Sequence, residues 1–307
     1  MTPRSSTPSP GVAHAADDHA ADDGIAEATT LARTHHENFP VLAPFLGSRR
    51  DELALVYAFC RTTDDLGDEL PGDRLAALDG WESMIRRALA GDPPADPPIM
   101  APLAELARRR ALPESLFLRL LEANRRDQRV HRYPDQAALL EYCEHSATPV
   151  GRMVLGVIGS GGDHAELADA TCIGLQLANF WQDVRRDWAQ GRCYLPLDRC
   201  RHHGVDPELE LGRDSASPPL RALLAERVED ARSWLERGWP LADHLPVRWR
   251  ALVRAFSRGG WAVCDALEAG GFDPLRSRPE ISRRTRRWIL LHELARSPRK
   301  GVALGRR

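Results

Sequence analysis

Apolar residues recur three to four positions apart along most of this chain, a spacing that places them on one face of an α-helix. Three such stripes are clear: Leu53, Val56, Phe59 and Cys60; Leu116, Leu120 and Ala123; and Val228, Ala231, Trp234 and Leu235. Alternating runs of β-branched residues joined by a hairpin turn, which would predict strands, do not occur in the sequence. The pattern therefore predicts an all-α protein.

Four clusters of Gly and Pro interrupt the helical pattern, at residues 91–98, 159–162, 212–219 and 270–279. No repeat with the period of a helical array is present. With 307 residues, 43% of them hydrophobic, the chain can bury one continuous core. We expect a helical domain over residues 25–297, a disordered segment over 1–24 that is rich in Pro, Ser, Ala and Asp, and a basic tail over 298–307.

Charge and composition narrow the class of protein. A formal net charge of −2 argues against a nucleic-acid-binding protein, for which a strongly basic domain is typical. No apolar run reaches the length of about 18 residues that a transmembrane helix needs, and no secretory signal is present. We therefore expect a cytoplasmic protein in which the six cysteines are reduced thiols.

The C-terminal region is much more basic than the rest of the chain. Residues 276–307 carry eleven Arg or Lys against only Glu280 and Glu293. Four arginines at 283–287 precede the apolar run Trp288–Leu291, an order that suits contact with an anionic membrane surface. We expect peripheral association with the inner face of the membrane, and an ordinary final helix with a solvated face is the alternative.

The first of two aspartate-rich segments, residues 61–69 (RTTDDLGDE), lies at the end of a predicted helix that Pro71 and Gly72 terminate. Asp64 and Asp68 are four residues apart, so their carboxylates share one helix face. Like charges repel at this spacing, and the C-terminal end of a helix dipole disfavours anions. A bound cation would remove both penalties.

The second segment, residues 176–187 (QLANFWQDVRRD), contains Asn179, Asp183 and Asp187 at i, i+4 and i+8, with Gln176 one turn earlier. This stripe of oxygen donors suits Mg²⁺, which takes one or two carboxylates together with water and substrate phosphate oxygens. Lys300 is the only lysine, so an anion site elsewhere in the chain must use arginine, which favours bidentate phosphate contacts.

Each segment alone is compatible with a solvated acidic face. Together, two Asp-x-x-x-Asp helices flanked by arginine predict the opposed walls of a metal–diphosphate site. A di-iron bundle is disfavoured because none of the eleven histidines has a Glu three residues before it. The group Cys193, Cys200, His202 and His203 does not match the ligand spacing of a structural zinc site.

These motifs resemble those of the squalene/phytoene synthase family. Residues 57–69 (YAFCRTTDDLGDE) and 177–187 (LANFWQDVRRD) are similar to its two signatures. The similarity extends over most of residues 30–295, and it includes Tyr142-Cys143, Val150-Gly151 and residues 191–196 (GRCYLP). The resemblance implies the isoprenoid synthase fold, a single helical domain around a central cavity.

The resemblance also implies a role for each matching residue. Five residues would bind Mg²⁺, and all but the asparagine would be catalytic: Asp64, Asp68, Asn179, Asp183 and Asp187. Five more would contact the diphosphate of an isoprenoid substrate: Tyr57, Arg61, Gln176, Asn38 and Arg192. Four aromatic residues are candidates for the wall of an apolar cavity, although core packing explains each of them more simply: Phe39, Phe59, Phe180 and Trp181.

Within the family, residues 37–41 (ENFPV) and the Asn-Phe-Trp-Gln-Asp form of the second motif look like the bacterial hydroxysqualene synthase branch of hopanoid pathways. Gln182 stands where condensing members usually place Arg, Arg186 replaces an acidic residue, and Thr148-Pro149 replaces a pair of small residues. These departures favour a lyase that converts presqualene diphosphate to hydroxysqualene.

Two other functions stay open. One is head-to-head condensation of two allylic diphosphates by a presqualene diphosphate, squalene or phytoene synthase. The other is an inactive helical homologue that assembles with other squalene-pathway enzymes, against which the complete ligand sets of both motifs argue.

Overall fold

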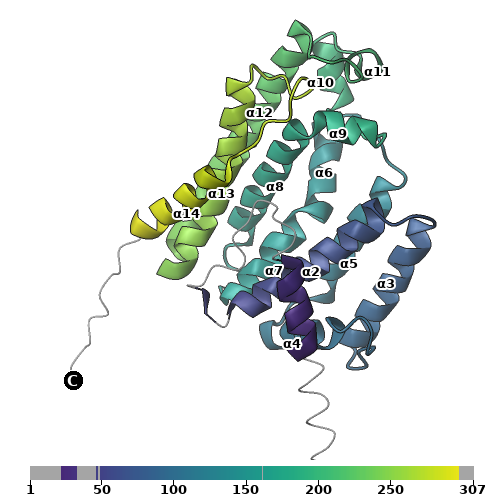
Figure 1. Ribbon diagram of the computed structural model, residues 1–307, viewed down its shortest axis with the longest axis vertical. Coiled ribbons are helices and arrows are strands. Elements are labelled where there is room, and N and C mark those ends of the chain that lie inside the picture. Colours follow the sequence, from purple (N-terminus) through teal and green to yellow (C-terminus); the bar gives the residue numbers. More distant parts are fainter. Residues whose placement is uncertain (1–21, 33–45, 48, 161, 297–307) are drawn as a thin grey trace, which may run out of the picture. The chain divides into compact units, whose positions relative to one another are not determined.

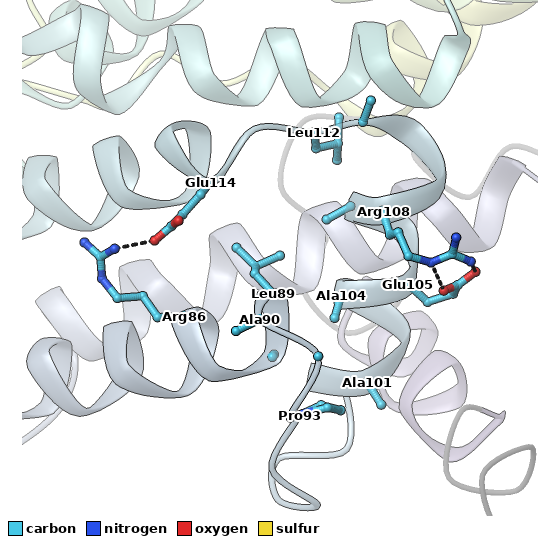
Figure 2. A pocket seen from close by; sticks show the side chains of 14 residues that line it. Arg86, Leu89, Ala90, Pro93, Ala101, Ala104, Glu105, Arg108, Leu112 and Glu114 are labelled. Carbon is cyan, nitrogen blue, oxygen red and sulfur yellow. Dashed lines mark hydrogen bonds and ion pairs between the residues drawn. The ribbon is translucent and has the colours of Figure 1, made fainter.

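The computed structural model describes residues 22–32, 46–47, 49–160 and 162–296, and every regular element in these ranges is a helix (Figure 1). Within them the only β-type pairing is an isolated parallel bridge between Arg132 and Cys193. The all-α prediction is confirmed. The described chain divides into two compact units, and the boundary falls inside one helix, between Leu118 and Arg119.

The first unit contains a helix over residues 22–32 followed by α2 (Arg49–Asp68), α3 (Arg74–Leu89), α4 (Met100–Arg110) and the start of α5 (Glu114–Asp127). Helix α3 begins where the Asp73 carboxylate accepts a hydrogen bond from the Ala76 amide at 3.0 Å, a typical N-cap. Helix α2 buries the predicted stripe of Leu53, Val56 and Phe59.

A buried hydrogen-bond chain fixes α3 against the second half of α2. The indole Nε1 of Trp81 donates to the Thr63 hydroxyl at 3.0 Å, and that hydroxyl donates to the Phe59 carbonyl at 2.8 Å. Both side chains are buried, so loss of either partner would leave an unsatisfied polar group in the core. This contact holds the turn of α2 that immediately precedes Asp64.

The second unit contains the rest of α5 and the later helices, in this order: α6 (Gln136–Ser146), α7 (Thr148–Ile158), α8 (Ala165–Gln182), α9 (Val184–Ala189), α10 (Leu197–His202), α11 (Pro207–Glu210), α12 (Pro218–Gly238), a 3-10 helix (Trp239–His244), α13 (Val247–Ala269) and α14 (Arg283–Arg296). Helix α8 is its centre, because it packs against α6, α7, α12 and α13 (Figure 1).

The crossing of α8 and α12 is close because glycines stand at the contact. A Cβ atom on Gly174 would lie 2.8 Å from the backbone nitrogen of Leu235, and one on Gly238 would lie 2.6 Å from the backbone nitrogen of Thr171. Leu177, Trp181 and Leu235 are fully buried around this crossing. The middle of α8 is therefore tightly packed in the core, and the second aspartate motif follows directly at its C-terminal end.

The predicted helix breaks coincide with the loops between α3 and α4, α7 and α8, α11 and α12, and α13 and α14. The predicted stripes are buried except for Cys60 and Trp234, which are half-buried. Residues 22–24, which we assigned to a disordered segment, begin the helix over 22–32. Residues 1–21 and 297–307 lie outside the described residues. None of the described helices is both long and apolar enough to cross a membrane.

Candidate active site

The first motif lies along one face of α2. Tyr57, Arg61, Asp64 and Asp68 follow one another at intervals of four, three and four residues, which places them on one side of the helix. Asp64 is exposed and the other three are half-buried, whereas Leu53, Val56, Phe59 and Thr63 are buried. The helix ends at Asp68, and Gly72 with a φ of 101° turns the chain away, as predicted.

Arg61 is held by acidic neighbours at the end of the same helix. Its Nη2 atom lies 2.5 Å from Asp65 Oδ1 and 2.8 Å from Glu69 Oε1. The side chain is 15% exposed, and the two ion pairs fix the orientation of its guanidinium.

The second motif crosses the junction of α8 and α9. Asp183 separates the two helices with a φ of −102° and a ψ of 12°. The backbone hydrogen bonds nevertheless continue, because Asp183 N donates to Asn179 O and Asp187 N donates to Asp183 O, both at 2.9 Å. The predicted stripe of Asn179, Asp183 and Asp187 is therefore preserved, and Gln176 lies two turns before Asp183 on the same face.

Asp187 has the most unusual electrostatic environment of the stripe. Its carboxyl is half-buried, and burial raises its pKa from 3.8 to about 7, with a further contribution from the neighbouring Asp183. Arg192 and Arg186 oppose the rise. Negative charge at Asp187 is thus costly in the protein alone, a cost that a bound cation would reduce.

Asp183 is paired with an arginine that is distant in sequence. Arg278, in the segment between α13 and α14, donates from Nε to Asp183 Oδ1 and from Nη2 to Oδ2 at 3.1 Å. The Nη2 atom also lies 3.3 Å from Gln182 Oε1. The segment is anchored on each side of Arg278, since Gln182 Nε2 donates to Pro279 O and Arg185 Nη1 donates to Leu275 O.

This arrangement bears on one inference from the sequence. Gln182 replaces an expected arginine, and that departure was one of three from which we predicted a lyase. The structure places the guanidinium of Arg278 against both Gln182 and Asp183. The glutamine therefore does not leave the second motif short of positive charge, and its identity alone does not distinguish a lyase from a condensing enzyme.

A second cluster that sequence reasoning missed surrounds Asp127 at the end of α5. Tyr142 donates to Asp127 Oδ2 at 2.5 Å, Tyr194 donates to Oδ1 at 3.2 Å, and Arg192 Nη1 lies 3.7 Å from Oδ2. Burial raises the pKa of both tyrosines well above 10, and proximity to Asp127 adds to the rise, so both remain hydrogen-bond donors. Arg192, a predicted diphosphate ligand, is thereby fixed in place.

The three aromatic candidates within the described residues belong to the core. Phe59 is fully buried and packs edge-on against Phe117 with ring centroids 5.1 Å apart. Trp181 is fully buried, and Phe180 stacks on Tyr194 at 3.9 Å. Phe39 and the predicted diphosphate ligand Asn38 lie outside the described residues. The predictions that the two motifs face each other and enclose a central cavity concern both units, and they stay predictions.

The donor set of the second motif fits Mg²⁺ in its chemistry. Asn179, Asp183 and Asp187 offer oxygen ligands, and two of them are partly buried carboxyl groups. Among the described residues no three His, Cys, Asp or Glu side chains gather closely enough to hold a metal ion by themselves. Mg²⁺ suits such an open set, because it keeps several waters and takes further oxygens from a phosphate-bearing substrate.

Comparisons with known proteins show which family the chain resembles. A family model described as squalene/phytoene synthase matches residues 32–285. A phytoene synthase from Thermus thermophilus is 36% identical over 229 residues, covering 74% of this chain and 76% of the relative. A hydroxysqualene synthase from Rhodopseudomonas palustris is 37% identical over 219 residues, covering 69% of this chain and 73% of the relative.

A solved structure extends the agreement to the fold. The squalene synthase HpnC from Alicyclobacillus acidocaldarius superposes with a TM-score of 0.77 at 39% identity, covering 82% of this chain and 95% of that one. The isoprenoid synthase fold that the motifs implied is thereby confirmed. The relatives carry different reaction names at similar identity, so similarity alone leaves the reaction unresolved.

Proposed function

The chain belongs to the squalene/phytoene synthase family, and on that premise we propose that it ionises presqualene diphosphate with the help of Mg²⁺ and gives hydroxysqualene and diphosphate after capture of water. The family consists of isoprenoid synthases that act on diphosphates. The observation that carries the proposal is the stripe of Asn179, Asp183 and Asp187, in which two partly buried carboxylates stand among arginines.

The proposal assigns Mg²⁺ to the two aspartate motifs. Asp64, Asp68, Asn179, Asp183 and Asp187 would hold it directly or through water. When bound, Mg²⁺ stabilises the negative charge that develops on a departing diphosphate. Two further observations support the assignment: the carboxyl of Asp187 is costly to ionise in the protein alone, and Asp183 pairs with a cationic group, the guanidinium of Arg278.

The diphosphate would be held by Tyr57, Arg61, Gln176, Arg192 and Asn38, which match family positions. Arg61 and Arg192 have fixed orientations because Asp65, Glu69 and Asp127 hold them. Preorganised donors lower the cost of orienting the leaving group. We add Arg278 to this set as the arginine that stands in for the one missing at position 182.

The proposed reaction balances without a redox partner. The bond between the cyclopropylcarbinyl carbon and the bridging oxygen breaks, and its electron pair leaves with the diphosphate. The cation rearranges, a water oxygen adds to it, and loss of one proton gives the alcohol. Because no hydride is delivered, NADPH is not required.

A second candidate is head-to-head condensation of two allylic diphosphates. Two observations favour it: the 36% identity to a phytoene synthase, and the guanidinium of Arg278 beside Gln182, the residue that replaces the arginine of condensing members. The Asn-Phe-Trp-Gln-Asp motif and the several relatives named hydroxysqualene synthase, at 37%, 35% and 31% identity, favour the lyase. An inactive assembly partner is disfavoured because both ligand sets are complete.

The test is product analysis by mass spectrometry with purified protein and Mg²⁺. Given presqualene diphosphate, the protein should form hydroxysqualene with or without NADPH, and EDTA should abolish the reaction until Mg²⁺ is restored. If farnesyl diphosphate alone yields presqualene diphosphate, if a C20 allylic diphosphate yields phytoene, or if squalene forms only with NADPH, the corresponding synthase replaces the lyase. Absence of any turnover on these substrates would support the inactive homologue.

A further inference from the structure

Helix α14 (Arg283–Arg296) buries only one of its faces. It packs against α13 through Ile289 and Glu293, which are 7% and 2% exposed. Arg258 of α13 donates from Nε to Glu293 Oε1 at 3.0 Å, so the acidic side chain of this face is paired and buried. The contact with α13 therefore determines which residues of α14 face the solvent.

That opposite face carries large apolar side chains in solvent. Trp288 is 61% exposed and Leu291 is 65% exposed, and with Leu209 they are the large exposed hydrophobic residues of the described chain. At 100° per residue, Arg284, Trp288, Leu291 and Ala295 form one stripe along the helix, with Arg287 beside it. An exposed pair of this size on one stripe suggests a surface that is covered in use.

The charge of the exposed face has one sign. The exposed ionisable residues of α14 are Arg283, Arg284, Arg287 and Arg296, and the single carboxylate of the helix, Glu293, is buried. Arg286 is half-buried and donates to the Ile281 carbonyl at 3.1 Å, so it belongs to the packed side. The complementary partner must therefore be anionic and apolar at once.

We propose that α14 docks on the surface of a bilayer that contains anionic phospholipid, with Trp288 and Leu291 entering the interface and the exposed arginines contacting lipid phosphates. A helix of 14 residues is about 21 Å long, which is short of the roughly 30 Å hydrocarbon core and suits a position parallel to the surface. Tryptophan prefers the level of the headgroups, and each basic residue near an anionic leaflet adds to binding.

Two other partners fit less well. The core of a protein–protein interface is depleted in charged residues, whereas arginines here stand within one turn of both apolar side chains. A nucleic acid would use the arginines but gives no place to Leu291. The proposal is independent of the catalytic function, since none of these residues belongs to the candidate active site.

Co-sedimentation with unilamellar vesicles tests the proposal with the full chain. The wild type should pellet with vesicles of phosphatidylcholine mixed with phosphatidylglycerol and much less with phosphatidylcholine alone, and added salt should weaken the binding. The double substitution Arg284→Gln with Arg287→Gln should lower the partition coefficient about fivefold for each arginine. The double substitution Trp288→Ala with Leu291→Ala should lower it by about tenfold.

Matched controls lie elsewhere on the second unit. Leu209→Ala removes an equally exposed leucine, and Arg201→Gln with Arg213→Gln removes two exposed arginines of α10 and the region after α11. These variants should bind like the wild type, and all variants should keep the wild-type melting temperature. Unchanged binding by both α14 variants, or no binding of the wild type at low salt, overturns the proposal. Self-association of the wild type that the α14 variants abolish would instead assign the face to a protein contact.

Discussion

The two aspartate motifs have the same Asp-x-x-x-Asp spacing but different surroundings. On α2, Asp64 is exposed, and the nearby Arg61 is held by Asp65 and Glu69. At the α8–α9 junction, the Asp183 side chain is 17% exposed and paired with Arg278, and burial raises the pKa of Asp187 to about 7. Of the carboxyl groups in the two motifs, Asp187 of the second is therefore the one whose ionisation is costly in the protein alone.

The difference shows that residue spacing predicts which helix face the carboxylates share, whereas burial determines how costly their negative charge is. Spacing alone places both pairs of carboxylates on one helix face. Burial then makes Asp187 costly as a free anion, so a cation gains more there, whereas water screens the exposed Asp64. Under the proposed function, we therefore expect Asp187 to gain more from a bound Mg²⁺ than Asp64 does.

The largest expected effect is on the rate. Asp64→Ala and Asp183→Ala should each lower kcat by about a hundredfold or more, the scale of removing one main electrostatic contributor to a transition state. Steady-state kinetics with presqualene diphosphate measures the loss, and circular dichroism checks that both variants fold. Glu166→Gln, which neutralises an exposed carboxylate of α8, is the control and should keep full activity. A fully active variant at either aspartate removes that residue from the site.

The next largest expected effect is a loss of kcat/KM on substitution of Arg278. Under the proposed function Arg278 is a charged hydrogen-bond donor to the diphosphate, so Arg278→Gln should lower kcat/KM about tenfold. If Arg278 stands in for an arginine at position 182, adding Gln182→Arg to that variant should restore part of the activity, whereas Gln182→Arg alone should not raise it. Equal rates for the wild type and Arg278→Gln would show that Arg278 only pairs with Asp183.

A smaller effect is on the stability of the helix that carries the second motif. Gly174→Ala should destabilise the protein by about 1–3 kcal/mol, since the new methyl would meet the backbone of Leu235 at 2.8 Å. Gly80→Ala on α3, where a Cβ meets nothing within 4 Å, is the matched control and should be neutral or slightly stabilising. Urea unfolding of both variants measures the difference, and equal midpoints would contradict the close α8–α12 crossing.

The smallest expected effect is on stability, and it compares the cost of a negative charge in the two motifs directly. In EDTA at pH 8, Asp187→Asn should raise the free energy of unfolding by about 1 kcal/mol, because it removes a costly buried charge. Asp64→Asn should leave it unchanged, because Asp64 is exposed. Thermal denaturation monitored by circular dichroism gives both values. If the two substitutions shift the melting temperature equally, burial does not distinguish the motifs.

Much of the fold could be predicted from local patterns. The apolar stripes of α2, α5 and α12 identified buried faces, because a helix repeats its contacts every three to four residues. Pro71-Gly72 and Gly191 ended the helices that carry the motifs. The break at Asp183 was missed, since its backbone still donates and accepts helix-type hydrogen bonds and no Gly or Pro marks it.

The site was predictable only where its residues are neighbours in sequence. Arg278 is 95 positions from Asp183, and Asp127 is 67 positions from Tyr194, so no spacing rule relates them. One feature of the sequence pointed toward Arg278. Gln182 replaces an arginine that the family pattern expects, so another arginine of the chain could be expected to supply the missing positive charge. For Asp127 no comparable signal exists, because an Asp after two arginines at the end of a helix is also typical of a solvated surface.

The central claim is ionisation of the carbon–oxygen bond followed by capture of water. Turnover of presqualene diphosphate with Mg²⁺ in water enriched in oxygen-18 tests it directly, with mass spectrometry of the isolated alcohol as the readout. The account predicts that the hydroxyl oxygen of hydroxysqualene comes from the solvent and that the released diphosphate keeps its unlabelled bridging oxygen. An unlabelled alcohol with the cyclopropane ring intact, or a labelled phosphate, would mean that the phosphorus–oxygen bond breaks, which would contradict the ionisation mechanism.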